Sequence, residues 1–160
     1  MKNTVLFLFS ILLINIACKS KGSPPQGDPG GNSVLSMKIN GVEWKATEKI
    51  TGSLGVLQDK QFVLGGVATP GNKQQNMNIL LENVSGPGTY TTSASAEYDI
   101  VQYLETDSNG EIAMYQSQKD GLFTINITRC NGLVTEGTFS GSLSGNPAAI
   151  IITDGKFKTQ

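Results

Sequence analysis

The sequence predicts an all-β domain, an antiparallel meander of about eight to ten strands that closes into a barrel or folds into a sandwich. From Val34 onward, apolar and polar residues alternate over short runs, which is the pattern of half-buried strands. Asn-Gly, Asp-Gly and Pro-Gly pairs separate these runs and favour tight turns. No long stretch has the three-and-four spacing of an amphipathic helix.

The clearest element is a hairpin over Met37–Lys45, closed by a two-residue turn at Asn40-Gly41. The predicted pairs are Met37 with Trp44, Lys38 with Glu43, and Ile39 with Val42. One face of the hairpin then holds the four apolar side chains, and the other pairs opposite charges. A slip of one residue would turn Trp44 toward water, so the register is tightly specified and we expect Trp44 in the core.

The remaining strands follow in order along the chain. They are expected at 50–57 and 61–68 around an Asp59-Lys60 turn, and at 76–81 with Met77, Ile79 and Leu81 on one face. Further strands are expected at 98–106 and 111–118 around the turn Asp107–Gly110, and at 122–129 and 133–143. The last two are expected at 149–153 and 156–159 around Asp154-Gly155. A tight reversal is expected at 86–88 and a strand end at Asn146-Pro147. In the last segment, Ile151 and Phe157 are expected in the core.

Two loops are possible between 122–129 and 133–143. A two-residue loop, Asn131-Gly132, would set Ile127 opposite Glu136. A three-residue loop that also includes Cys130 would give the pairs Ile127 with Thr135, Ile125 with Gly137, and Phe123 with Phe139. We expect the second register, because it places apolar side chains opposite one another.

Residues 1–17 are typical of a secretory signal peptide. Lys2 supplies the positive charge, and the apolar run from Val5 to Ile14 is shorter than the roughly 20 residues that span a bilayer. Ala17 precedes Cys18 as a cleavage site requires, and the segment resembles a bacterial lipoprotein signal, which implies cleavage before Cys18 and acylation of its thiol and amino group. An uncleaved anchor, or ordinary secretion with a chance cysteine, is the alternative.

Residues 18–33 are expected to be a lipidated cysteine and a flexible tether, because Gly, Pro, Ser and charged residues dominate them. The folded domain is then 34–160. The predicted location is the outer membrane, attached by lipid. No acidic cluster follows Cys18, so a periplasm-facing position is favoured over the cell surface.

Composition excludes several kinds of chemistry. The chain has 160 residues, no histidine, 12 basic and 13 acidic side chains. Without histidine there is no Ser-His-Asp or Cys-His arrangement and little prospect of a zinc or copper site. Without a basic surplus, nucleic acid is an unsuitable partner. We therefore expect no metal, no cofactor and no catalytic residues.

Two groups of oxygen-bearing side chains are candidate sites. Asp107, Asn109 and Glu111 offer oxygens for a weak Ca²⁺ site, but a plain turn is favoured because such a loop needs about six ligands. Glu97 and Asp99 share a strand face, as the paired carboxylates of a glycosidase would. Solvated strand charges are the favoured interpretation.

Aromatic residues and the second cysteine are weaker candidates. Tyr90, Tyr98, Tyr103, Tyr115 and Trp44 include possible sugar-stacking or protein-contact residues, although Trp44 is better explained by the core. Cys130 has no expected intrachain partner and is interpreted as a small apolar residue at a turn.

Four segments occur in a recognisable order along the chain. They are Met37–Ala46 after the lipidated cysteine, Gly88–Tyr90 midway, Gly137–Ser140 late, and Ile152–Phe157 at the end. In this order the chain, over 34–158, resembles an uncharacterised family of Bacteroidetes lipoproteins, a domain of unknown function. The resemblance implies a β-rich domain on the outer membrane and supplies no catalytic residues.

Two functional interpretations follow. The favoured one is a non-catalytic outer-membrane lipoprotein whose domain binds an envelope protein, a glycan or a small apolar ligand, or supports envelope structure. The alternative is a histidine-free, carboxylate-dependent glycan hydrolase, or an inhibitor of an envelope enzyme, which as a hydrolase needs an acid pair in a cleft with shifted pKa values. Dense packing of Met77, Ile79, Phe123 and Phe139 would argue against carriage of a ligand inside the barrel.

Overall fold

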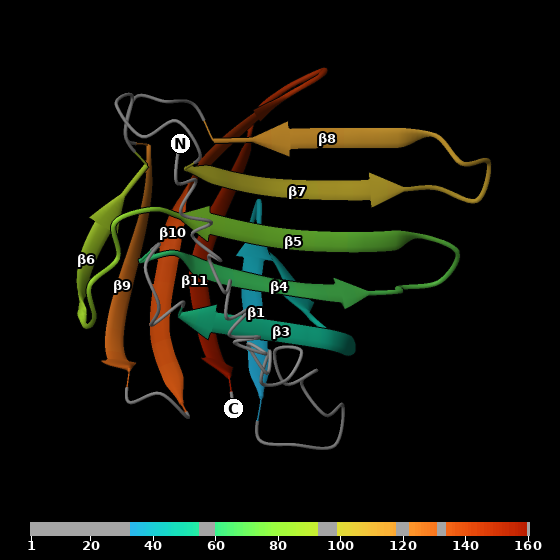
Figure 1. Cartoon of the computed structure of the whole chain (residues 1–160). Coiled ribbons are helices and arrows are strands. Elements are labelled where there is room, and N and C mark those ends of the chain that lie inside the picture. Colours follow the sequence, from blue (N-terminus) through green and yellow to red (C-terminus); the bar gives the residue numbers. More distant parts are fainter. Residues whose placement is uncertain (1–32, 55–59, 93–98, 118–121, 131–133, 160) are drawn as a thin grey trace, which may run out of the picture.

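The computed structural model describes residues 33–54, 60–92, 99–117, 122–130 and 134–159 (Figure 1). The strands are β1 (Val34–Ile39), β2 (Val42–Lys45), β3 (Glu48–Leu54), β4 (Phe62–Ala68), β5 (Gln74–Leu81), β6 (Gly88–Thr91), β7 (Ile100–Thr106), β8 (Ile112–Gln116), β9 (Phe123–Cys130), β10 (Thr135–Gly145) and β11 (Ile150–Thr159). Over these ranges the chain forms strands and turns without a helix, which confirms the all-β prediction. It follows that none of the described segments is a helix of the length and apolarity needed to cross a membrane.

The strands form one curled antiparallel sheet, a half-barrel. The order is β2-β1-β11-β10-β8-β7-β5-β4-β3, with β9 paired to β10 and β6 paired to β9. In Figure 1, β3, β4, β5, β7 and β8 form a front layer, and the strands β1, β11, β10, β9 and β6 run crosswise behind it. The curl lets one face of each layer bury apolar side chains against the other.

β10 joins the two layers. Its first part pairs with β9 as far as Gly141, and its last residues, Ser144 and Gly145, pair with β8. The strand bends at Gly141, which has φ +154° and sits at a register shift. A Cβ there would collide with the carbonyl oxygen of Leu122 and lie 2.6 Å from Cα of Phe123. The corner therefore requires glycine.

Two predicted hairpins are confirmed in detail. β1 and β2 pair Met37 with Trp44 and Ile39 with Val42, around Asn40 and Gly41 at positive φ. β7 and β8 are joined by a turn in which the Gly110 amide donates to the Asp107 carbonyl oxygen at 3.1 Å. The predicted β3–β4 pairing is also present, although Asp59 of its turn lies outside the described residues.

The reversal after β5 leads to a different layer. Gly86 has φ +146°, as a tight bend requires, but the chain then enters β6, which pairs with β9 and not with β5. β5 pairs instead with β4 and β7. Among the described strands, four consecutive pairs are not neighbours in the sheet, β2/β3, β5/β6, β6/β7 and β8/β9, so the meander is interrupted at these connections and β6 forms the outer edge of the back layer.

The predicted register of β9 and β10 was wrong by two residues. Ile127 lies opposite Gly137, not Thr135, and Phe139 lies opposite Ile125. A shift of two keeps the same faces inward, so burial does not distinguish the two registers. In the observed register Gly137 has no room for a side chain, because a Cβ there would collide with the backbone oxygen of Asn126 and lie 2.6 Å from Cζ of Phe157. The Phe157 ring occupies the space that Gly137 leaves.

The last segment is a single strand with a bulge. Asp154 has φ +53°, and the pairing of β11 shifts by one residue beside it. The extra residue reverses the alternation, so Ile152 is buried before the bulge and Phe157 after it. The expectation for Phe157 is confirmed, whereas Ile151 was wrongly placed in the core and is 57% exposed.

The centre of the half-barrel is filled by aromatic rings. Phe62 and Phe157 have ring centroids 5.4 Å apart, Phe139 and Phe157 are 6.4 Å apart, and Phe123 and Phe139 are 6.0 Å apart. Met77, Ile79, Phe123 and Phe139, the interior residues named from the sequence, are all buried. The ring cluster links β4 in the front layer to β9, β10 and β11 in the back layer.

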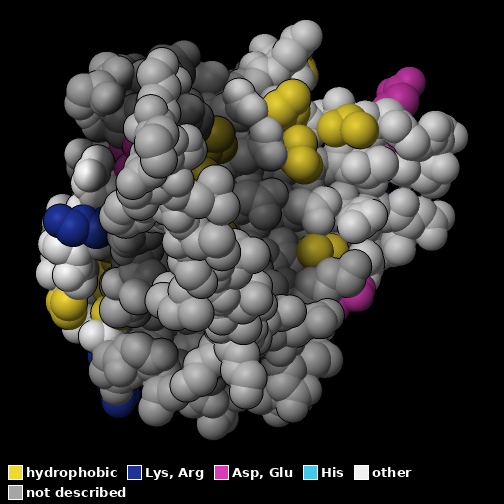
Figure 2. Space-filling model, viewed as in Figure 1, with side chains coloured by type: hydrophobic (Ala, Val, Ile, Leu, Met, Phe, Trp, Pro, Cys, Tyr) yellow, Lys and Arg dark blue, Asp and Glu magenta, His cyan; other side chains and the backbone are white. Residues whose placement is uncertain are grey.

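The outer face of the front layer also carries apolar side chains. Figure 2 shows hydrophobic side chains gathered over the upper part of this layer, where β7 and β8 lie. The exposed apolar residues of these two strands are Ile100, Ile112 and Met114. They alternate with side chains that face the interior, as the pleat requires.

Candidate functional site

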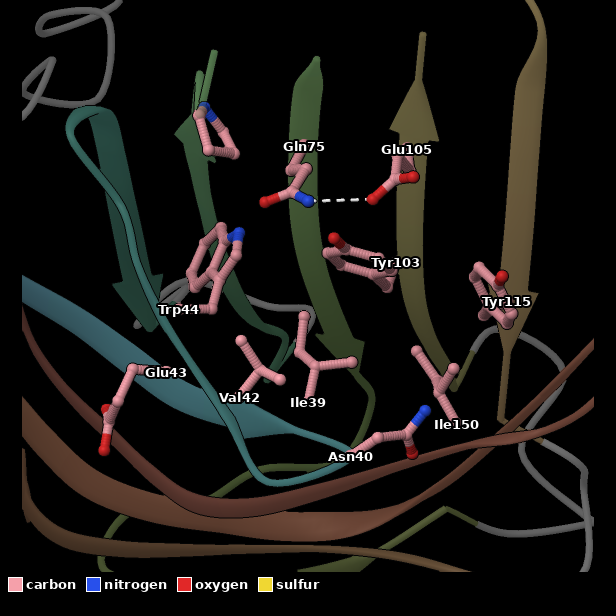
Figure 3. Close-up of a pocket in the computed structure, with 11 residues that line it drawn as sticks. Ile39, Asn40, Val42, Glu43, Trp44, Gln75, Tyr103, Glu105, Tyr115 and Ile150 are labelled. Atoms are coloured by element: carbon pink, nitrogen blue, oxygen red, sulfur yellow. Dashed lines mark hydrogen bonds between the residues drawn. The ribbon is translucent and has the colours of Figure 1, made fainter. Parts of the chain in front are cut away.

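A pocket of about 400 Å³ opens at the end of the half-barrel where the two layers separate (Figure 3). One wall is the β1–β2 hairpin, and the other is formed by β5, β7 and β8. The lining residues are Ile39, Asn40, Val42, Glu43, Trp44, Pro70, Gln75, Tyr103, Glu105, Tyr115 and Ile150. In Figure 1, the β4–β5 and β7–β8 hairpins project beyond the back layer at this end.

The β1–β2 hairpin is fixed in place by its turn. Asn40 donates its amide to the carbonyl oxygen of Ile151 at 2.9 Å, and its side-chain oxygen accepts from the amide of Ile151 at 2.8 Å. These two bonds attach the hairpin tip to β11. The positions of Val42 and Trp44, on the strand that follows the turn, are therefore set by the back layer.

Trp44 contributes a hydrogen-bond donor without an acceptor. Its side chain is 5% exposed, and its Nε1 atom is buried with no hydrogen-bond partner in the described part of the chain. Buried indole N–H groups usually find an acceptor, because an unpaired donor costs about 1–3 kcal/mol. In Figure 3 the indole stands at one side of the pocket with its nitrogen toward the side where Gln75 lies.

Two tyrosines form the facing wall. Tyr103 and Tyr115 are a cross-strand pair of β7 and β8, with ring centroids 6.0 Å apart. Tyr103 is buried, and burial is the main reason that the pKa of its phenol is raised, with the charge of Glu105 adding to the effect. The phenol therefore stays protonated and acts as a neutral polar group.

The polar part of the pocket is centred on Glu105. Its carboxylate accepts hydrogen bonds from Lys73 Nζ at 2.6 Å and from Gln75 Nε2 at 2.8 Å. These bonds, that of Lys73 first, lower the pKa of Glu105, and the same contact raises the pKa of Lys73. Glu105 is thus an anion whose charge is balanced by a lysine that does not line the pocket.

The second acid of the lining lies apart from this group. The carboxylate of Glu43 is directed away from Gln75 and Glu105 in Figure 3. Lys38 lies 3.7 Å from it and makes its closer ion pair, at 2.8 Å, with Asp154. The pocket lining contains these two acids and no lysine or arginine.

The structure brings together three of the aromatic residues singled out in the sequence. Trp44, Tyr103 and Tyr115 all line the pocket, although Trp44 is at the same time a buried residue as expected. Tyr90 lies elsewhere and donates its hydroxyl to the carbonyl oxygen of Gly86 at 2.7 Å. Tyr98 is outside the described residues.

The acidic candidates do not form a site. Asp107 accepts from the amides of Asn109 and Glu111 at 2.8 and 2.9 Å, so its side chain closes the turn, and these bonds lower its pKa. Asp99 accepts from the amide of Glu82 at 2.9 Å, while Glu97 is outside the described residues. In the described part of the chain, no group of three or more Cys, Asp or Glu side chains could hold a metal ion.

Cys130 does not line the pocket. It is a free, half-buried thiol, 3.9 Å from the hydroxyl of Thr135. Cys18 precedes the described residues, so its lipidation stays a prediction.

Gln75 and Glu105 were missed in the sequence, although a signal for them exists. Gln75 has the parity of Met77 and Ile79 on β5, and Glu105 has the parity of Val101 and Tyr103 on β7. A polar side chain at an inward position of an otherwise apolar face indicates a place where the interior is wet or meets a ligand.

Comparison of the chain with protein-family models, with curated proteins and with solved structures finds no match.

Proposed function

We propose that this protein is a non-catalytic, lipid-anchored protein of the outer membrane whose β domain binds a small ligand in the pocket between the β1–β2 hairpin and the β5–β7–β8 wall. The single observation that carries the proposal is the buried Nε1–H of Trp44, which has no acceptor among the residues that the structure describes. Because this atom exposes less than 1 Å² of surface, a ligand with a hydrogen-bond acceptor would pair it after a small shift of the indole.

The size and the lining of the pocket support a small-molecule site. Such sites are typically 300–1,000 Å³, mostly apolar, with a few convergent polar groups. Here the volume is about 400 Å³, the aromatic walls are Trp44, Tyr103 and Tyr115, and the polar groups are Gln75 and Glu105. The filled aromatic centre of the half-barrel argues against a long apolar ligand held between the layers.

The state of Glu105 favours binding over hydrolysis. A glycosidase needs a general acid whose pKa is raised and a second carboxylate close to it. The pKa of Glu105 is lowered by Lys73 and Gln75, and the carboxylate of Glu43 is directed elsewhere. No acidic side chain is fully buried in the ranges that the structure describes. The carboxylate-dependent hydrolase is for these reasons the less favoured alternative.

The anchor and the location rest on residues 1–33. A signal peptide that ends before Cys18, followed by about fifteen flexible residues with an r.m.s. span of roughly 20 Å, would hold the domain clear of the membrane. The test is fractionation of the native host. Wild-type protein should appear in the outer-membrane fraction with acyl chains on Cys18, and Cys18→Ala should be lost from that fraction. Equal recovery of the two forms would refute the anchor.

The binding proposal can be tested with an internal probe, because Trp44 is the only tryptophan of the chain. The mature protein, Cys18–Gln160, would be titrated in detergent micelles with a set of small molecules that covers sugars, amines, carboxylic acids and aromatic fragments. At least one class should change Trp44 fluorescence in a saturable way. Val42→Arg, which fills the mouth from a position that is 69% exposed, should abolish the change. No response from any class would reject the pocket as a binding site.

A further inference from the structure

We infer that the ligand of this pocket is a neutral, hydroxylated ring, that is, a monosaccharide or disaccharide unit. This inference rests on the proposed binding function and specifies its substrate class. It follows from three features of the pocket: the hydrogen bonds that its polar groups leave unmade, the charge of its lining, and the arrangement of its aromatic faces.

The unmade hydrogen bonds call for a ligand that both donates and accepts. Trp44 offers one donor, Nε1–H, and needs an acceptor. Glu105 accepts from Lys73, Gln75 and the Tyr103 hydroxyl, which leaves about one of the four lone pairs of the carboxylate for a ligand donor. In Figure 3 the carboxamide oxygen of Gln75 points away from Glu105, toward the side of the pocket where Trp44 stands. A hydroxyl group is a donor and an acceptor in one atom, and a ring bearing several hydroxyls can satisfy both sides of the pocket.

The lining offers no cationic side chain that could hold an anion, and its central acid is already paired with a lysine. Glu43 and Glu105 are the charged residues of the lining, so a carboxylate or a phosphate would find no positive partner there. The charge of Glu105 is already balanced by Lys73, whose Nζ lies 2.6 Å from it. An ammonium ligand would compete with that lysine and would supply no acceptor for Trp44. The remaining class is neutral.

The aromatic residues supply a limited apolar surface for a sugar ring, since Trp44 and Tyr103 are 5% and 3% exposed and Tyr115 is half-buried. Trp44 stands on one side of the pocket, and Tyr103 and Tyr115 stand on the other (Figure 3). Val42 and Ile150 extend the apolar surface at the mouth. A pyranose has C–H groups on its faces and hydroxyls at its rim, so its faces bury apolar area while its rim reaches the polar groups.

The test uses the indole signal of ¹⁵N-labelled mature protein in micelles, a single cross-peak because Trp44 is the sole tryptophan. The probes are methyl β-D-glucoside, N-acetyl-D-glucosamine and maltose as neutral sugars, D-glucosamine as the cationic counterpart, and D-glucuronate as the anionic one. At least one neutral sugar should move the indole proton downfield in a saturable way. Glucosamine and glucuronate should bind at least tenfold more weakly than that sugar.

Two variants assign the contacts. Trp44→Phe keeps a ring and removes the donor, and Glu105→Gln keeps the shape and removes the charged acceptor. Each should weaken binding of the neutral sugar about three- to tenfold, the effect of one hydrogen bond, measured by ligand-observed saturation transfer. Glu136→Gln is the matched control, since this carboxylate is also ion-paired, at 3.6 Å from both Arg129 and Lys158, but does not line the pocket. It should leave affinity unchanged.

The possible outcomes separate this inference from the proposal beneath it. Tighter binding of glucosamine or glucuronate than of every neutral sugar would overturn the ligand class and leave the binding site standing. The same holds if only aromatic fragments or amines respond. If no compound of any class moves the indole signal, both statements fall. Should Trp44→Phe not fold, Glu105→Gln and its Glu136→Gln control decide the matter.

Discussion

The closed centre and the open end of this half-barrel use the same strands in different ways. At the centre, Phe62 and Phe157 from opposite layers are in ring contact, and the side chains around them are buried. At the open end, the strands of the front layer continue past the back layer, and their inward positions hold Gln75 and Glu105. The inward face thus changes from apolar to polar where the opposing layer ends.

The apolar centre and the polar open end are expected to serve different purposes, the first stability and the second binding. Burial of aromatic side chains dominates the stability of a small β domain, because each contributes several kcal/mol. The open end instead leaves an indole N–H unpaired and keeps a carboxylate charged in a partly buried place. Substitutions at the centre should therefore alter the free energy of unfolding, and substitutions at the open end should alter binding with little effect on stability.

The largest effect is expected from Phe157→Ala. The ring contacts Phe62 and Phe139 and fills the space over Gly137, so its loss leaves a cavity that the rigid sheet cannot close. The free energy of unfolding in urea should fall by about 3–5 kcal/mol. Val42→Ala, at an exposed position on the rim of the pocket, should change it by no more than about 0.5 kcal/mol. Comparable losses for the two variants would contradict the division between centre and end.

The residues that form this centre were largely predictable. Alternation identifies Met77, Ile79 and Phe123 as interior, and the Asn40-Gly41 turn fixes the first hairpin to the residue. Alternation fails after a bulge, because one extra residue exchanges the faces, and Asp154 gives no sign in the sequence that it takes positive φ within a strand instead of closing a turn. The exposure of Ile151 follows from that single residue.

The pocket was only partly predictable for a related reason. Trp44, Tyr103 and Tyr115 stand out by type, but they lie on three strands, and their meeting depends on how two layers cross. Gln75 and Glu105 can be recognised only because each is a polar residue at an inward-facing position of its strand. The branch that places β9 beside β10 and β6 beside β9, which completes the back layer, is a long-range pairing that local patterns do not contain.

A second test concerns the register of β9 and β10. In Gly137→Ala the added methyl would meet the Asn126 backbone and the Phe157 ring, so the free energy of unfolding should fall by about 1–3 kcal/mol. Thr138→Ala, at the next and exposed position, should change it by about 0.5 kcal/mol or less. Urea unfolding measures both. A neutral Gly137→Ala would mean that the ring of Phe157 does not pack over this residue.

A smaller loss is expected from Trp44→Phe. The variant removes apolar area, but it also removes a buried donor whose missing partner costs about 1–3 kcal/mol. The two effects oppose each other, so the free energy of unfolding should fall by at most about 1 kcal/mol. Ile125→Val, a smaller truncation at the closed centre, should cost about 0.5–1.5 kcal/mol. A loss from Trp44→Phe well above that of Ile125→Val would indicate that the indole N–H is paired.

The smallest effect concerns pH and the Lys73–Glu105 pair. The folded protein lowers the pKa of Glu105 below its ordinary value of 4.5, so the unfolded chain binds this proton more readily. The stabilisation is fully present above that ordinary value and is lost as pH falls through the lowered pKa of the folded state. Glu105→Gln should therefore be less stable than wild type at neutral pH, by at most about 1 kcal/mol for so exposed a pair.

This difference should shrink as the pH is taken below 4.5, when the wild-type carboxylate takes up its proton. Urea unfolding of both proteins along a pH series measures it. In a Lys73→Met background, the lysine that contributes most to the lowered pKa of Glu105 is gone. The same Glu105→Gln change should then show a smaller dependence of stability on pH. A difference in stability that stays constant across the pH series would mean that Lys73 does not hold Glu105 as an anion. The charge of Glu105 in the pocket would then not be balanced by this lysine.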